Sequence, residues 1–201
     1  MKILLLTRNA NTLRAVQTLF PLADLSEWCS NDNDYHRPVQ AIGAQSALRA
    51  LESRLTEYYE LTNPDAPAEF TLIIGIETYI DIDTTTEKVA ILFDEPTDLI
   101  RMVSPQAGVP LPDWVIPAAI GQCTSEYRLR TGGLSVKVGS VMNARFPEIP
   151  VNDYVPHLAN HLDNYVPFDS RYHQLLSALE AVVIKQLAAS AHRIISQQQT
   201  K

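Results

Sequence analysis

Residues 70–77 read FTLIIGIE and are the most hydrophobic strand candidate in the chain. A continuous apolar run of this kind is typical of a strand that is covered on both faces of a sheet. Residues 2–7, KILLLT, show the same pattern at the start of the chain. Residues 88–93 predict a further strand, with residues 84–87 as the hairpin turn before it, and residues 99–104 predict another.

Helices are predicted between and after these strands. Apolar residues recur at helical spacing over residues 13–20 and 44–59, and residues 172–195 predict a long helix. Residues 114–119 fit a short helix, and residues 132–138 begin with a glycine pair and predict a strand. Strands and helices alternate except at the hairpin, which predicts an α/β fold with a mixed central sheet flanked by helices.

The chain has 201 residues, of which 46% are hydrophobic and 19% charged, as expected of a single globular domain over residues 1–201. Residues 146–168 carry four prolines and are interpreted as an insertion within it, with a short helix at residues 157–162. The net charge of −7 argues against duplex nucleic acid and anionic membranes as partners. The apolar start, residues 3–6, is too short for a signal peptide or a membrane span, which favours a cytoplasmic protein.

Glycine is scarce, with seven in the chain, and two common phosphate-binding motifs are absent. No three glycines form G-x-G-x-x-G, and none forms G-x-x-x-x-G-K. A bound nucleotide would therefore be held by other means.

The polar loop at residues 7–12, TRNANT, follows the first strand and precedes a helix. Such a loop presents backbone N–H groups and a helix N-terminus to an anion, and Thr7 and Asn9 add side-chain donors. The loop is interpreted either as a phosphate-binding corner or as an ordinary capped helix start.

Glu77 ends the central apolar strand and is followed by Asp81 and Asp83. In a regular strand these carboxylates share one side, which suggests a site for a hard cation such as Mg²⁺. The alternative is that the two aspartates face solvent on a hairpin.

Residues 169–174, DSRYHQ, open the last helix with Arg171, His173 and Gln174 in its first turn. These side chains would suit a phosphate or the edge of a base. The alternative is a helix cap followed by a solvent-facing arginine.

Five segments occur in an order that resembles one known family. Residues 4–16, LLLTRNANTLRAV, resemble its strand and T-x-N-x-x-K loop, and residues 42–50, IGAQSALRA, resemble its G-A helix. Residues 74–81, IGIETYID, resemble its G-I-E strand end with a following I-D. Residues 130–135, RTGGLS, loosely resemble its K-x-G-A-I-G stretch, and residues 171–174, RYHQ, its final arginine and Y-H-Q. Together they resemble the house-cleaning inosine/xanthosine triphosphatases of the ITPase/Maf-like fold.

The resemblance implies a Mg²⁺-dependent hydrolase of nucleotide metabolism, with Mn²⁺ as a substitute, that acts on deaminated purine nucleoside triphosphates such as ITP and XTP. It implies a homodimer. Glu77 would hold the metal, and Asp81 would join it as a catalytic residue. The residues implied to bind the substrate are Thr7, Asn9, Arg130, Gly132, Gly133, Arg171, His173 and Gln174.

The chain departs from the family pattern at several positions. Thr12 stands where the family has its loop lysine, and Arg130 stands for a second lysine. Acidic residues are missing from residues 37–41, and Thr78 and Tyr79 replace small residues beside Glu77. These changes favour an alternative, a weakened or inactive relative that serves as a nucleotide-binding or protein-interaction module. If the order of motifs is coincidental, the chain is an unrelated α/β domain.

Overall fold

The computed structural model describes residues 1–29, 39–62, 69–95, 98–103, 108–160 and 171–199. The described residues form an eight-stranded sheet, in which hydrogen bonds connect β2 to β1, β1 to β4, β4 to β3 and β3 to β8. Strands β1 (Lys2–Leu5), β2 (Asp24–Glu27), β3 (Gln40–Ile42) and β4 (Leu72–Asp81) are parallel. Strand β5 (Thr86–Glu95) pairs antiparallel with the other edge of β4.

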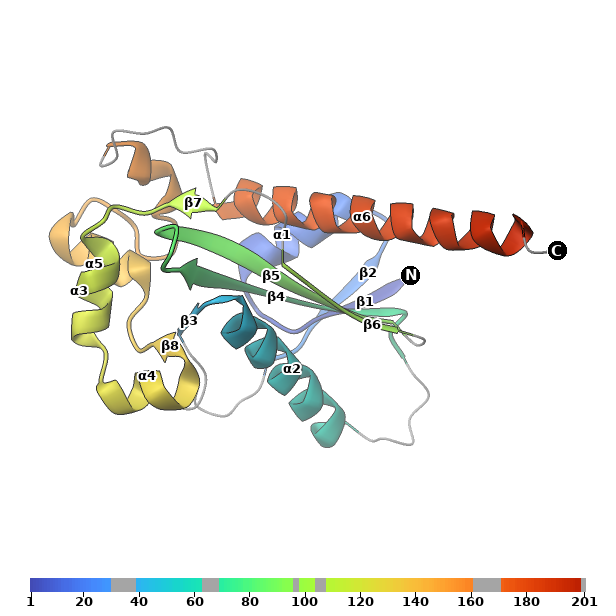
Figure 1. Cartoon of the computed structure of the whole chain (residues 1–201), viewed down its shortest axis with the longest axis horizontal. Helices are drawn as coiled ribbons and strands as arrows, with labels where there is room; N and C mark the ends of the chain where they lie inside the picture. Colours follow the sequence, from blue (N-terminus) through green and yellow to red (C-terminus); the bar gives the residue numbers. More distant parts are fainter. Residues whose placement is uncertain (30–38, 63–68, 96–97, 104–107, 161–170, 200–201) are drawn as a thin grey trace.

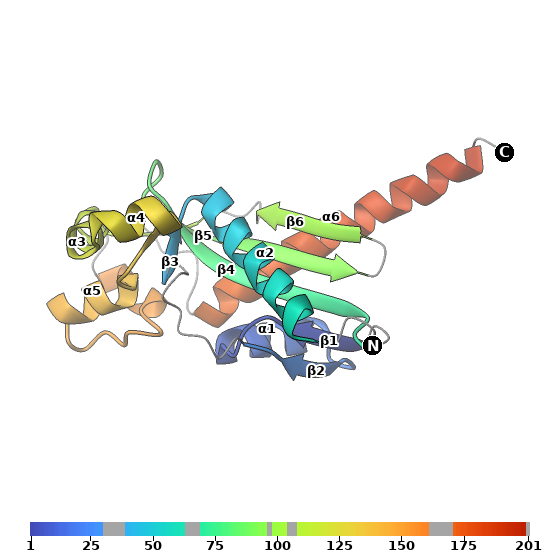
Figure 2. The same ribbon diagram turned by 90° about the horizontal axis from the view of Figure 1, so that it is seen from below.

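Shorter strands complete a mixed sheet. Strands β6 (Asp98–Val103) and β7 (Val109–Pro110) are antiparallel to β5, and β8 (Gly133–Leu134) is antiparallel to β3. Helices α1 (Ala10–Leu19) and α6 (Arg171–Gln199) cover one face, and α2 (Ala44–Leu61) covers the other (Figures 1 and 2). The α/β fold predicted from the sequence, a mixed central sheet flanked by helices, is confirmed, as expected of an ITPase/Maf-like arrangement.

The two faces of β4 bury different side chains because successive residues of a strand point to opposite sides. Ile74 and Ile76 pack in the core beneath α1 and α6, whereas Ile73 and Tyr79 pack in the core beneath α2. Glu77 therefore lies on the side of the sheet that α2 covers.

A cluster of short helices closes one end of the sheet (Figure 1). It consists of α3 (Val115–Gln122), α4 (Ser125–Thr131), α5 (Val138–Arg145) and a 3₁₀ helix, η2 (Val155–Asn160). The expected strand over residues 132–138 is wrong beyond Leu134, because a helix begins at Val138 and packs into this end of the core. The described part of the predicted insertion supplies buried core side chains, including Ile149, Tyr154 and Leu158. Its remainder, residues 161–168, lies outside the described residues.

One edge of β4 has a gap that positions the candidate site. β1 pairs with this edge as far as the Leu5–Ile74 pair, and β3 begins to pair with it at the Ala41–Tyr79 pair. Between the two pairings, none of the described strands lies beside the central part of β4 on that edge. Among the described helices, none combines the length and the apolar character needed to cross a membrane.

Candidate functional site

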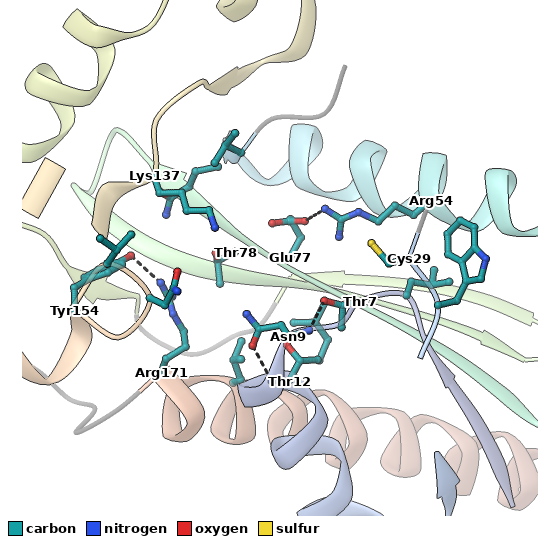
Figure 3. Close-up of a pocket in the computed structure, with 18 residues that line it drawn as sticks. Thr7, Asn9, Thr12, Cys29, Arg54, Glu77, Thr78, Lys137, Tyr154 and Arg171 are labelled. Atoms are coloured by element: carbon teal, nitrogen blue, oxygen red, sulfur yellow. Dashed lines mark hydrogen bonds and ion pairs between the residues drawn. The ribbon is translucent and has the colours of Figure 1, made fainter. Parts of the chain in front are cut away.

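A cleft of about 410 Å³ opens at the gap in the edge of β4 (Figure 3). Its lining residues come from the ends of β1 and β2, the start of α1, the start of β3, the centre of β4, the middle of α2, the residue before α5, residues 151–154 and the start of α6. Three cationic side chains, Arg54, Lys137 and Arg171, line it, with Glu77 as the carboxylate among its described lining residues. The cleft thus carries local positive charge in a chain whose net charge is negative, which favours an anionic ligand.

The loop after β1 forms one wall of the cleft. Asn9 is the N-cap of α1, and its side-chain oxygen accepts hydrogen bonds from the backbone N–H groups of Asn11 and Thr12, at 2.9 and 3.2 Å. The Thr7 hydroxyl accepts the Asn9 N–H at 3.2 Å. The two interpretations of this loop are therefore compatible: it caps the helix, and Thr7, Asn9 and Thr12 also line the cleft.

Glu77 projects from β4 and forms an ion pair with Arg54 of α2. Their side chains are 13% and 18% exposed, so most of the pair is shielded from solvent. Arg54 carried no signal in the sequence, because it is one of several charged residues of α2.

Arg171, at the start of α6, also lines the cleft and is held by a buried network. Its guanidinium donates from Nη1 to the Glu87 carboxylate and, at 2.7 Å, to the Gln174 side-chain oxygen. It donates from Nη2 to the Tyr154 hydroxyl at 2.8 Å, and that hydroxyl also bonds Glu87. Glu87 was expected in the hairpin turn, but the turn occupies residues 82–85 and Glu87 belongs to β5, where it is fully buried.

Lys137 also lines the cleft. It was not predicted as a site residue, because its segment was expected to be a strand. It is the N-cap residue of α5. The start of that helix is fixed by β3, since the Gln40 side-chain oxygen accepts the Val138 N–H at 2.8 Å. Figure 3 shows Lys137 on the side of the cleft away from the Thr7–Thr12 wall. No described residue forms an ion pair with it.

Four predicted site residues do not line the cleft. Arg130 lies on α4, exposed, at 3.7 Å from Glu126. Gly132 ends α4 in the left-handed conformation, and Gly133 pairs with β3. Both glycines therefore connect α4 to the sheet, away from the cleft. Asp81 lies beyond the cleft on β4 and is paired with Lys88 at 2.5 Å, which lowers the pKa of its carboxyl.

The two remaining predicted residues also lie outside the lining. His173 is exposed on α6, with its ring beside that of Tyr172. Gln174 is 2% exposed and lies behind Arg171, where its side-chain nitrogen donates to the Glu87 carbonyl at 3.3 Å. The structure therefore brings together Thr7, Asn9, Glu77 and Arg171.

A divalent cation fits this cleft only in part. Among the described residues, no group of three or more histidine, cysteine, aspartate or glutamate side chains could hold a metal ion. Mg²⁺ is commonly bound by one or two carboxylates together with substrate phosphates, so Glu77 supplies one suitable ligand. That carboxylate already pairs with Arg54.

Comparisons with known proteins give a fold relationship. No family model matches the sequence, and no curated protein matches it. The structure is similar to the crystal structure of protein VC0702 from Vibrio cholerae, with a TM-score of 0.56 and 15% sequence identity. The similarity covers 92% of this chain and 96% of that chain. At this identity the likeness establishes the shared fold alone.

Proposed function

We propose that the chain is a Mg²⁺-dependent nucleoside triphosphate hydrolase that acts on deaminated purine nucleotides such as ITP and XTP. One observation carries the proposal: Thr7, Asn9, Glu77 and Arg171, which come from separate segments, line one cleft. On the sequence resemblance to the inosine/xanthosine triphosphatases, we also propose that it works as a cytoplasmic homodimer.

The polyphosphate would lie in the cleft among its three cationic side chains, Arg54, Lys137 and Arg171. Arg171 and Lys137 would bind phosphate oxygens, because a guanidinium and an ammonium are strong charge-assisted donors to phosphate. Thr7 and Asn9 would bind the same phosphates from the wall that the loop after β1 forms. Arg54 would exchange the Glu77 carboxylate for a phosphate oxygen.

Glu77 is the residue that would hold the metal. Bound Mg²⁺ supplies charge neutralisation on the phosphates and activation of a water molecule. The remaining contribution of the chain is to orient the phosphates, since phosphoryl transfer depends chiefly on positioning and electrostatic stabilisation. Asp81 has no part in this proposal because it lies outside the cleft and is paired with Lys88.

A second candidate function is nucleotide binding without turnover. The ion pair between Glu77 and Arg54 favours it, because the carboxylate proposed to hold the metal already has a partner. In this case the cleft would bind the polyphosphate through its cationic side chains alone.

Release of phosphate and pyrophosphate from ITP, XTP and the common nucleoside triphosphates with Mg²⁺ distinguishes the two candidates. We expect turnover by the parent and at least about a hundredfold loss in Glu77→Gln, since the variant removes the ligand proposed to hold the metal. The matched control is Arg130→Ala, which removes a cation outside the cleft and should retain the parent rate.

Thermal unfolding in the presence of each nucleotide gives the second readout. Stabilisation of the parent without any turnover would contradict the hydrolase and support the binding module. If the parent shows no turnover and no stabilisation by any nucleotide, both candidates are contradicted.

A further inference from the structure

A fully buried carboxylate, Glu87, lies beneath the cleft wall and has no role in the proposed chemistry. It is 0% exposed, and its oxygens bond Arg171 and Tyr154. Burying a charge in this way is costly unless it is paired and hydrogen-bonded, and here both conditions are met. The network therefore specifies one arrangement of its members.

The bonds around Arg171 determine which part of its guanidinium remains available. Arginine has five N–H donors in a fixed planar fork. The contacts to Glu87, Gln174 and Tyr154 use both hydrogens of Nη1 and one of Nη2. The Tyr154 hydroxyl also bonds the carboxylate held at Nη1, so it lies toward the Nη1 side of Nη2. Bonds to described residues thus leave the edge formed by Nε–H and the outer Nη2–H.

That edge has the geometry for a bidentate bond to a phosphate group. Arg171 lines the cleft, whereas Glu87 does not. The carboxylate therefore orients the guanidinium from behind without contacting a ligand.

We propose that Glu87 is a positioning residue that fixes Arg171 so that its free edge binds a phosphate group in the cleft. The inference rests on the proposed function for the identity of the anion. Tyr154 and Gln174 complete the orientation by bonding two further donors of the same guanidinium.

The sign of a substitution at Glu87 separates positioning from simple electrostatics. Glu87→Gln removes a negative charge close to the anion site, so by charge alone it would tighten anion binding. If Glu87 positions Arg171, the variant releases the guanidinium and weakens binding instead. Glu52→Gln is the matched control, because it removes the same charge from an exposed pair with Arg101 outside the cleft.

The experiment measures the affinity of the full chain for inorganic pyrophosphate by calorimetry. We expect Glu87→Gln to weaken binding about tenfold, the value of one charge-assisted hydrogen bond, and Glu52→Gln to bind as the parent does. In an Arg171→Lys background, Glu87→Gln should not weaken binding further, because lysine has no planar edge to orient. A merely structural role for Glu87 would weaken binding equally in both backgrounds.

Tyr154→Phe keeps the test available if Glu87→Gln does not fold, because it removes only the hydroxyl that bonds both partners. It should weaken pyrophosphate binding severalfold, by the loss of one orienting hydrogen bond. Unchanged or tighter binding in the foldable variant overturns the proposal while the proposed function survives. Pyrophosphate binding that needs Glu87, without turnover of any nucleotide, supports the proposal and contradicts the hydrolase. No binding by the parent overturns both.

Discussion

The Glu77 carboxylate on β4 and the Arg54 guanidinium on α2 form an ion pair at the cleft, largely shielded from solvent. The pair links the central strand to the helix that covers it. In the cleft without a ligand, the carboxylate proposed to hold a metal is therefore neutralised by a neighbouring cation.

Removal of Arg54 should therefore destabilise the fold through the carboxylate that it leaves behind. We expect Arg54→Met, which keeps most of the apolar stem, to lower the free energy of unfolding by about 2 kcal/mol. In a Glu77→Gln background the same change should cost about 0.5 kcal/mol or less, because no unpaired charge remains. Urea unfolding of the parent, both single variants and the double variant measures this coupling.

The pair between Glu52 and Arg101 provides the control for that cycle. Its side chains are 35% and 46% exposed, so water replaces the lost partner. Arg101→Met should cost about 0.5 kcal/mol or less. Equal losses at Arg54 and Arg101 would contradict the shielding of the cleft pair.

Lys137 should contribute directly to anion binding, although no motif in the sequence marks it. Lys137→Ala is expected to raise the Kd for tripolyphosphate about tenfold, since it removes a charge-assisted contact from the wall of the cleft. Arg130→Ala removes the same charge from α4 and should leave the Kd unchanged within about twofold. Titration calorimetry at fixed ionic strength compares the two variants, and a larger effect at Arg130 would show that the anion binds elsewhere.

The pair between Asp81 and Lys88 should give a stability contribution that depends on pH. The hydrogen bond from Lys88 lowers the pKa of Asp81 in the folded state below its value in the unfolded chain. The contribution is therefore present above the unfolded pKa of about 4 and is lost as the pH falls through the folded pKa. We expect Asp81→Asn to cost about 0.5–1 kcal/mol at pH 6, with the difference from the parent shrinking as the pH falls below the folded pKa.

Denaturant unfolding at several pH values over this range measures that difference. Asp83→Asn removes the same charge from an exposed turn residue and should change the free energy of unfolding at pH 6 by less than about 0.5 kcal/mol. A constant difference between the parent and Asp81→Asn over the whole range would contradict the prediction.

Two glycines in neighbouring helices should respond oppositely to alanine. A Cβ on Gly139 of α5 would overlap the carbonyl of Val151, which lines the cleft, so we expect Gly139→Ala to cost about 3 kcal/mol or more. A Cβ on Gly121 of α3 meets no atom within 4 Å. Gly121→Ala should stabilise the chain by about 0.5–1 kcal/mol through helix propensity, as thermal unfolding can measure.

Local patterns were sufficient to predict most of the fold. The apolar run that became β4 and the helical spacing that became α2 are signals within single segments. Helix α4 was missed because none of its residues is buried, and helix α5 was missed because its amphipathic pattern is weak.

The candidate site was predictable only where a motif carried it. Thr7, Asn9, Glu77 and Arg171 stand at the ends of elements, where polar residues next to apolar runs attract notice. Glu87 carried no such signal, because its partner Arg171 lies 84 positions away in the sequence. Its polar neighbours also made residues 84–87 resemble a turn, which the structure places at residues 82–85.

The gap between β1 and β3 along β4 separates the position of the cleft from its chemistry. The place of the cleft is determined by strand register, which main-chain hydrogen bonds maintain regardless of side-chain identity. Its chemistry depends on a few side chains, such as Arg54 and Lys137, that can be exchanged without moving any strand. The scaffold can therefore keep a binding cleft at the same position in the sheet while the ligand that the cleft binds changes from one chain to another.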